Sequence, residues 1–220
     1  MRLGKDEWNR WAISVTRVQE DLQSTVNDRA VFAGFKEVVR SNGDWIDAHE
    51  GGFFCQFVLR SYIASIALGV RRQLKHRDDS ISLMHVLSQM KECAPQLSFE
   101  FYLERFPRDP DYVPWQEPTF KLVSEDGRFA SERIISGDIE ELKKLTSQVE
   151  AFVDRTLAHL DPRGFDGNLS VDEIENAVDA LDRIACKYIC LLTGKGYRSL
   201  EATIQFDWKK IFSVPLCKPA

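Results

Sequence analysis

The sequence predicts an all-α protein: an antiparallel helical bundle with an irregular insertion rich in proline and aromatic residues. Two observations predict this class. Apolar residues recur every three or four positions along most of the chain, which is the period of an amphipathic helix. Clear boundary signals, such as the Ser170–Glu173 capping box and the Gly194–Gly196 stop, separate the periodic segments. With 44% hydrophobic residues, the 220 residues can bury the core of a single domain over 1–220.

Residues 1–48 predict N-terminal helices. The periodic pattern breaks near residues 25–28, so we expect two helices before a strong stop at Ser41-Asn42-Gly43-Asp44, whose residues favour turns. The expected apolar stripe consists of Trp8, Trp11, Val15, Val18 and Leu22, followed by Val31, Phe32, Phe35, Val38 and Val39.

Residues 49–94 predict the first part of the bundle core. A long helix is expected from about 49 to 76, and a short one from about 81 to 92, which begins after Ser80 and ends before Pro95. The apolar stretch 53–70 contains Arg60 at its middle. A charged residue there is unfavourable in a bilayer, so we interpret the stretch as a buried core helix.

Residues 95–130 form the predicted insertion. Pro107, Pro110, Pro114 and Pro118 exclude a continuous helix, so we expect an extended segment or a short hairpin. Its aromatic residues favour a segment that covers the protein's own core, and binding of a partner is the alternative. These aromatic residues are Phe106, Tyr112, Trp115 and Phe120.

Residues 136–194 complete the predicted core with helices over about 138–160 and 170–193. A C-terminal helix at about 200–212 and a tail are expected within 195–220. We find no motif for a metal or a cofactor, and the five cysteines are widely spread, as in a protein with reduced thiols. The N-terminal residues lack the apolar core of a secretory signal, so the expected location is cytoplasmic, without a membrane partner.

Charge restricts the classes of partner. The net charge is −5, which argues against bulk electrostatic binding of nucleic acid. Residues 51–77, however, contain five basic residues and no acidic one. Arg71 and Arg72 lie there at the end of the long helix, where they can form ion pairs with acidic helices or contact phosphate and RNA.

A second candidate segment is 153–161, Val-Asp-Arg-Thr-Leu-Ala-His-Leu-Asp. Arg155 and His159 lie one turn apart on one side of the predicted helix. Such a pair suits a phosphodiester, because His can move protons while Arg stabilises phosphate charge. The alternative is that His159 is a partly buried histidine whose hydrogen bond is satisfied by Asp161 or a backbone carbonyl.

In two segments the sequence resembles the HEPN superfamily, and most closely its AbiU2-like, abortive-infection subgroup. The first segment runs from Arg71 through Asp78 to Leu83, and the second comprises Asp154 to His159. The resemblance implies a helical bundle that often forms a homodimer. Active relatives are metal-independent RNases whose sites combine an arginine and a histidine at the dimer interface, in phage-defence or toxin–antitoxin systems with a partner antitoxin or defence protein.

The chain departs from the pattern of that family at the arginine. His159 matches the histidine, but Asp154-Arg155 matches the pair that follows the family's arginine, which puts Val153 in the arginine position. Residues 138–182 also carry twelve acidic and four basic residues, a balance that discourages RNA. Two functions stay open. The first is an RNase in which His159 acts as acid–base and Arg155 binds the phosphate, with Arg71 and Arg72 binding the substrate and Asp154 and Asp161 in support. The second is a non-catalytic interaction or scaffold module.

Overall fold

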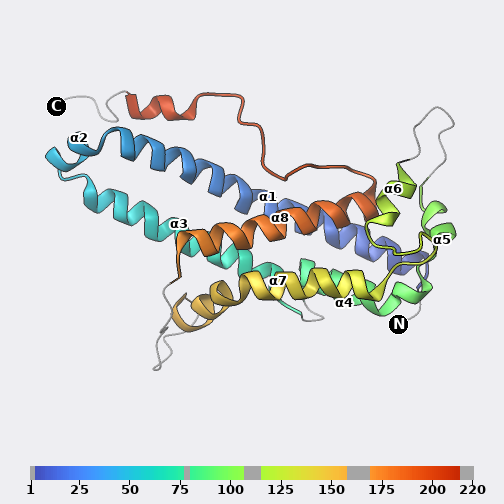
Figure 1. The fold of residues 1–220 in the computed structure, drawn as a ribbon. Helices are drawn as coiled ribbons and strands as arrows, with labels where there is room; N and C mark the ends of the chain where they lie inside the picture. Colours follow the sequence, from blue (N-terminus) through green and yellow to red (C-terminus); the bar gives the residue numbers. More distant parts are fainter. Residues whose placement is uncertain (1–2, 77–79, 107–114, 158–168, 214–220) are drawn as a thin grey trace.

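The computed structural model describes residues 3–76, 80–106, 115–157 and 169–213, and in this part of the chain it is all-α, as predicted. The main bundle consists of α1 (Lys5–Ser41), α3 (Gly52–Leu74), α7 (Glu132–Phe152) and α8 (Val171–Thr193). Helix α1 runs antiparallel to α3 and α8, and α7 runs antiparallel to α8 (Figure 1). Helix α4 (Leu83–Cys93) packs against α1, α3 and α7.

Helix α1 is continuous, so the break expected at residues 25–28 is wrong. Thr25 and Val26 are buried, and Asn27 and Asp28 use their side chains for contacts with other elements. Asn27 accepts a hydrogen bond from the Ala202 backbone N–H at 2.8 Å. The weak helix propensity of this segment is therefore overridden by its packing against α3 and α8.

Helix α3 is only partly the buried core helix that the sequence predicts. Its second half is buried, from Tyr62 to Leu74, but Phe53, Phe54 and Phe57 are 75%, 56% and 54% exposed. Among the described residues α3 is the one helix long and apolar enough to cross a membrane, with 28% of its most apolar window buried. The first half is exposed because it extends, with α2 (Gly43–Ala48), beyond the ends of α7 and α8 (Figure 1).

The insertion covers the protein's own core, as predicted, but it is more helical than expected. It contains η1 (Ala94–Gln96), α5 (Phe99–Leu103) and α6 (Gln116–Lys121), and a single bridge joins Ser98 to Phe129. Residues 107–114, with three of the prolines, lie outside the described residues. The insertion contributes to the core the buried side chains of Leu97, Tyr102, Phe120 and Val123.

Both ends of α8 form as the sequence predicts. Ser170 and Glu173 make the capping box, and Gly194 ends the helix in the left-handed region at φ 72°. Helix α7 begins at Glu132, six residues before the expected start, because Ser131 caps it by accepting a hydrogen bond from the Ile134 N–H.

The expected C-terminal helix over 200–212 is wrong for its first part. Only η3 (Trp208–Ser213) forms, as a 3₁₀ helix against α1. The backbone N–H groups of Leu200 and Ala202 donate to side chains of α8 and α1, so they are not available for a helix at that position.

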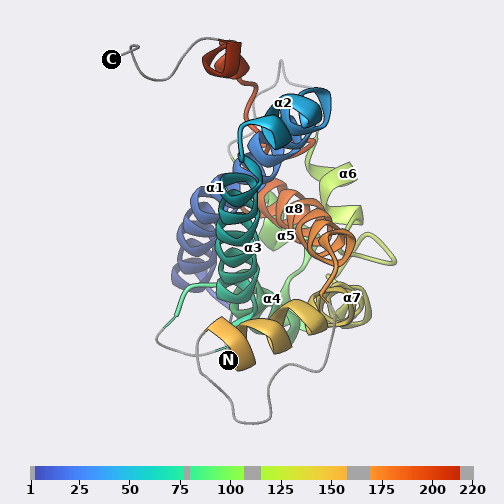
Figure 2. The same cartoon turned by 90° about the vertical axis from the view of Figure 1, so that its left-hand side faces the viewer.

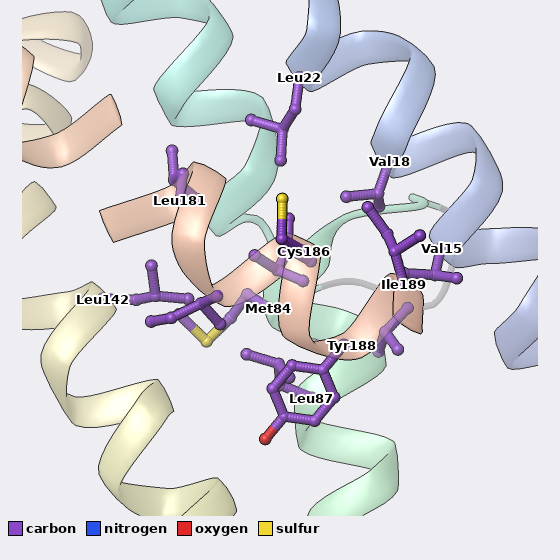
Figure 3. Close-up of a cluster of buried hydrophobic side chains, with 14 of the residues drawn as sticks. Val15, Val18, Leu22, Met84, Leu87, Leu142, Leu181, Cys186, Tyr188 and Ile189 are labelled. Atoms are coloured by element: carbon purple, nitrogen blue, oxygen red, sulfur yellow. The ribbon is translucent and has the colours of Figure 1, made fainter. Parts of the chain in front are cut away.

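The core lies where α1, α4, α7 and α8 meet (Figure 3). Valines and Leu22 from α1 face Cys186 and Ile189 of α8, while Met84, Leu87 and Leu142 close the lower side. The apolar stripe predicted for the first half of α1 is buried throughout, which confirms that prediction. This core holds α3 and α7 side by side, and that arrangement brings the two candidate segments together.

Candidate functional site

The structure brings the two candidate segments into direct contact. Arg71 and Arg72 occupy the last turn of α3, and Asp154 and Arg155 lie in η2 (Val153–Leu157), a turn of π-helix that continues α7. Single π-turns inside or at the end of helices occur frequently at functional sites. His159 and Asp161 lie outside the described residues, so the structure does not place them.

Arg71 is held by two carboxylates of the α7–η2 segment. Its Nε and Nη2 donate to the two carboxylate oxygens of Asp154 at 2.9 and 3.4 Å. Its Nη1 lies 3.6 Å from Oε1 of Glu150. The Arg71 side chain is 22% exposed, so it is largely enclosed by this arrangement. A cation that faces two carboxylates has little charge left for a phosphate.

Arg72 is paired in the same way with α1. Its Nε lies 3.1 and 3.2 Å from the two oxygens of Asp21. Asp21 also accepts from Nε2 of buried Gln73 at 2.7 Å, and Oε1 of Gln73 accepts from the Leu83 N–H at 3.0 Å. These bonds tie α1, α3 and the start of α4 together. The ion-pair interpretation of Arg71 and Arg72 is therefore the one that the geometry supports.

The position that the sequence resemblance would assign to an arginine holds a core residue. Val153 is 2% exposed and belongs to the hydrophobic core, so no polar group stands there. Arg155, two residues later, is exposed, and the described part of the chain gives it no carboxylate partner. Among the described residues, Arg155 is thus a cation of this face without a carboxylate partner.

Two histidines lie near the same end of α3. The rings of His76 and His85 have centroids 5.5 Å apart, and Nε2 of His85 lies 2.8 Å from Nε2 of Gln89. Gln89 in turn accepts from the indole N–H of Trp11 at 3.1 Å. Within the described ranges no group of three or more His, Cys, Asp or Glu side chains could hold a metal ion, so this pair has no third ligand there.

Sequence reasoning missed two carboxylates on the α7–α8 side, the buried Asp182 and the largely buried Asp138. Asp182, 7% exposed, accepts from Ser199 Oγ at 2.6 Å and from the Leu200 N–H at 2.8 Å. Asp138 accepts from Lys187 and from the Tyr188 hydroxyl at 2.6 and 2.7 Å. The signal available in the sequence was an aspartate at an apolar position of each stripe. Both carboxylates are satisfied and join elements, so their role is structural.

Burial governs the titration of the groups beside these carboxylates. It raises the pKa of Cys186 to about 12 and, together with the nearby Asp138 charge, raises the pKa of Tyr188 well above its ordinary value. The Cys186 thiol is therefore protonated at neutral pH and unsuited to act as a nucleophile.

Apolar grooves flank α1 at the end opposite to the insertion. One, with a volume of about 390 Å³, lies between α1, α3 and η3 and includes Phe54, Phe57 and Phe212 in its lining. The other, of about 370 Å³, lies on the other side of Phe32 and Phe35 and reaches Val171. Their walls are mainly aromatic and aliphatic, and the periodic pattern did not reveal them because it predicted burial for Phe54 and Phe57.

No family model, curated protein or solved structure matches the chain. The assignment of function therefore depends on the geometry of the residues themselves.

Proposed function

We propose that this chain is a HEPN-type helical protein of the AbiU2-like group that acts through protein–protein association and does not cleave RNA. One observation supports this most strongly: Arg71 is bound by Asp154 and Glu150, while the core residue Val153 fills the position of the family's arginine. A face whose cations serve its own carboxylates offers a phosphate backbone little attraction. As a protein of this group, it would work in phage defence or in a toxin–antitoxin pair.

A second candidate function, metal-independent RNA cleavage, is favoured by one observation. Arg155 is exposed on the π-turn and has no carboxylate partner within the described ranges, and His159 follows it by four residues in the sequence. In that function His159 would move the protons of the 2′-hydroxyl and of the leaving oxygen, and Arg155 would stabilise the charge on the phosphate.

A metal-free RNA degradation assay separates the two functions. Labelled single-stranded and hairpin RNAs are incubated in EDTA with wild type, His159→Ala, Arg155→Ala and Arg198→Ala. Arg198 is a matched control, because it is also exposed and follows the C-terminal end of α8, whereas the candidate segment precedes its N-terminal end.

The proposed function predicts no cleavage above the protein-free blank by any of the four proteins. Cleavage by wild type and Arg198→Ala that disappears in His159→Ala and Arg155→Ala would overturn it and establish the RNase.

A further inference from the structure

The first half of α3 presents an exposed aromatic surface. Phe53 and Phe57 lie one turn apart on the same side of the helix, and they are 75% and 54% exposed. Phe54, 56% exposed, lies beside them, with its ring centroid 6.5 Å from that of Phe57. Figure 2 shows the middle of α3 in the foreground of the molecule. We call these three residues the α3 aromatic face.

The α3 aromatic face continues into the groove between α3, α1 and η3. Phe54 and Phe57 of α3, Val31 of α1 and Phe212 of η3 all line this groove. Phe212, 42% exposed, is held in place by Phe35, whose ring centroid is 6.1 Å away. The groove, about 390 Å³ in volume, is large enough to receive aromatic side chains from a neighbour.

The exposed area is that of a protein interface. A fully exposed aromatic side chain has an accessible area of about 150–250 Å². With their exposed fractions, Phe53, Phe54, Phe57 and Phe212 together present about 450 Å² of apolar surface. A stable interface takes about 800 Å² from each partner, and a little over half of it is apolar. Four side chains thus supply about the whole apolar area that one protomer needs.

The charges around the face are complementary to one another when two copies meet in antiparallel orientation. Arg60 follows the phenylalanines along α3, and Asp47 and Glu50 precede them; all three are exposed. Within the described ranges Arg60 has no carboxylate partner, and neither acidic side chain has a basic one. If two α3 helices cross antiparallel near residue 55, Arg60 of one copy lies opposite residue 50 of the other.

A bilayer is a poorer occupant of this surface. Helices that bind membrane surfaces are rich in lysine and arginine, whereas Arg60 is the single basic residue in the first half of α3, and Asp44, Asp47 and Glu50 lie close to it in sequence. A spanning helix would also require the second half of α3 to leave the core, where Gln73 is 2% exposed and bonded to Asp21 and Leu83.

We infer that the α3 aromatic face and its groove bind a second copy of this chain, in a two-fold symmetric dimer with the two α3 helices antiparallel. This deepens the proposed function, because it names the partner and the surface of the association. The two Arg71–Asp154 ion pairs stand at the opposite end of α3 from this interface, so the dimer does not join them into one site.

Light scattering after size exclusion, over a dilution series, tests the inference on the full chain. Wild type is expected at twice the monomer mass of 25.3 kDa. Phe53→Ser combined with Phe57→Ser is expected to raise the dimer dissociation constant by roughly 100-fold or more, because each dimer loses four buried rings. Ile13→Ser is the matched control, since Ile13 is 58% exposed on α1 outside the face.

A charge reversal tests the antiparallel arrangement. Arg60→Glu is expected to raise the dissociation constant about tenfold, and adding Asp47→Arg and Glu50→Arg is expected to restore it. Far-ultraviolet circular dichroism checks that each variant is folded.

Each of the other results overturns the inference. The inference is wrong if wild type is monomeric at about 100 μM. It is also wrong if the double serine variant still forms the dimer as wild type does, or if the triple charge variant stays dissociated. A monomer that floats with neutral vesicles, and loses this in the double serine variant, would assign the face to a membrane. None of these results depends on RNA, so they leave the proposed absence of cleavage to its own assay.

Discussion

Arg71 at the end of α3 donates to both carboxylate oxygens of Asp154 in the π-turn, and this pair joins the two segments that resemble an RNase family. Asp154 directly follows Val153, the residue in the position of the family's arginine. The ion pair thus commits the Arg71 cation to an internal contact within the two segments that carry the resemblance. It is the structural observation that supports the proposal of association rather than cleavage.

The ion pair should contribute modestly to stability. In a double-mutant cycle of Arg71→Ala and Asp154→Ala, we expect a coupling energy of about 0.5–1 kcal/mol, because the two side chains are 22% and 48% exposed and solvent weakens their attraction. Urea unfolding of the four proteins measures it. Strictly additive effects would show that the contact is not formed in solution.

The crossing of α1 and α3 depends on the absence of a side chain at Gly69. A Cβ at that position would lie 2.5 Å from Thr25 Oγ1 and 3.2 Å from its Cγ2. Gly69→Ala should therefore lower the free energy of unfolding by about 1–3 kcal/mol, and Thr25→Ala in the same chain should recover most of the loss.

Gly137→Ala is the control for that pair, because nothing lies within 4 Å of the added Cβ on α7. It should stabilise the protein by about 0.5–1 kcal/mol through helix propensity. If Thr25→Ala does not recover the free energy of unfolding that Gly69→Ala loses, α1 and α3 do not approach each other closely at this point.

The C-terminal segment is held on the bundle by Asp182. Asp182→Asn should lower the free energy of unfolding by about 1–3 kcal/mol, because a buried acceptor of the Ser199 hydroxyl and the Leu200 N–H is weakened. Limited proteolysis should then cut within 195–213 faster than in wild type. Asp207→Asn, at an exposed position, should change neither quantity; equal effects of the two variants would argue against the anchor.

Stability should fall in alkaline solution. Burial raises the pKa of Tyr62 from 10.0 to about 12, and it also raises the pKa of Tyr188 well above its ordinary value. Below pH 10 the tyrosine hydroxyls are protonated in both the folded and the unfolded protein. Above pH 10 the unfolded protein loses these protons first, so the free energy of unfolding decreases between about pH 10 and 12. Urea unfolding at about pH 8, 10 and 11 measures this decrease.

Tyr62→Phe isolates the contribution of one tyrosine. Its hydroxyl is buried without a hydrogen-bond partner among the described residues, so the variant should be as stable as wild type, or more stable, at about pH 8. Its alkaline loss should be smaller by up to about 1.4 kcal/mol per pH unit. An alkaline decrease as steep as that of wild type would contradict the assignment.

The helices were predictable where local signals and packing agree. The stripe from Trp8 to Leu22 is buried, and the Ser170 capping box forms. The break expected at Thr25 was wrong because tertiary contacts outweigh weak propensity. The burial expected for Phe53 was wrong because periodicity shows which side chains share a face, and not how far a neighbouring helix extends.

The candidate site was only partly predictable. The sequence indicated that Arg71 and Arg72 can form ion pairs, and the structure identifies their carboxylates as Asp154, Glu150 and Asp21. Asp21 and Asp154 lie 51 and 83 residues along the chain from the arginines that they bind, so only the packing of the helices could reveal them as partners. The role of His159 stays a prediction, since the structure does not describe it.

The most direct test of the central claim is the affinity of the purified protein for a short fluorescent single-stranded RNA, measured by anisotropy in EDTA at physiological salt. We expect no saturable binding up to about 100 μM, because Arg71 and Arg72 are bound to carboxylates of the chain itself. A dissociation constant below about 1 μM that rises steeply with salt, and that Arg71→Ala or Arg155→Ala weakens while Arg198→Ala does not, would contradict it.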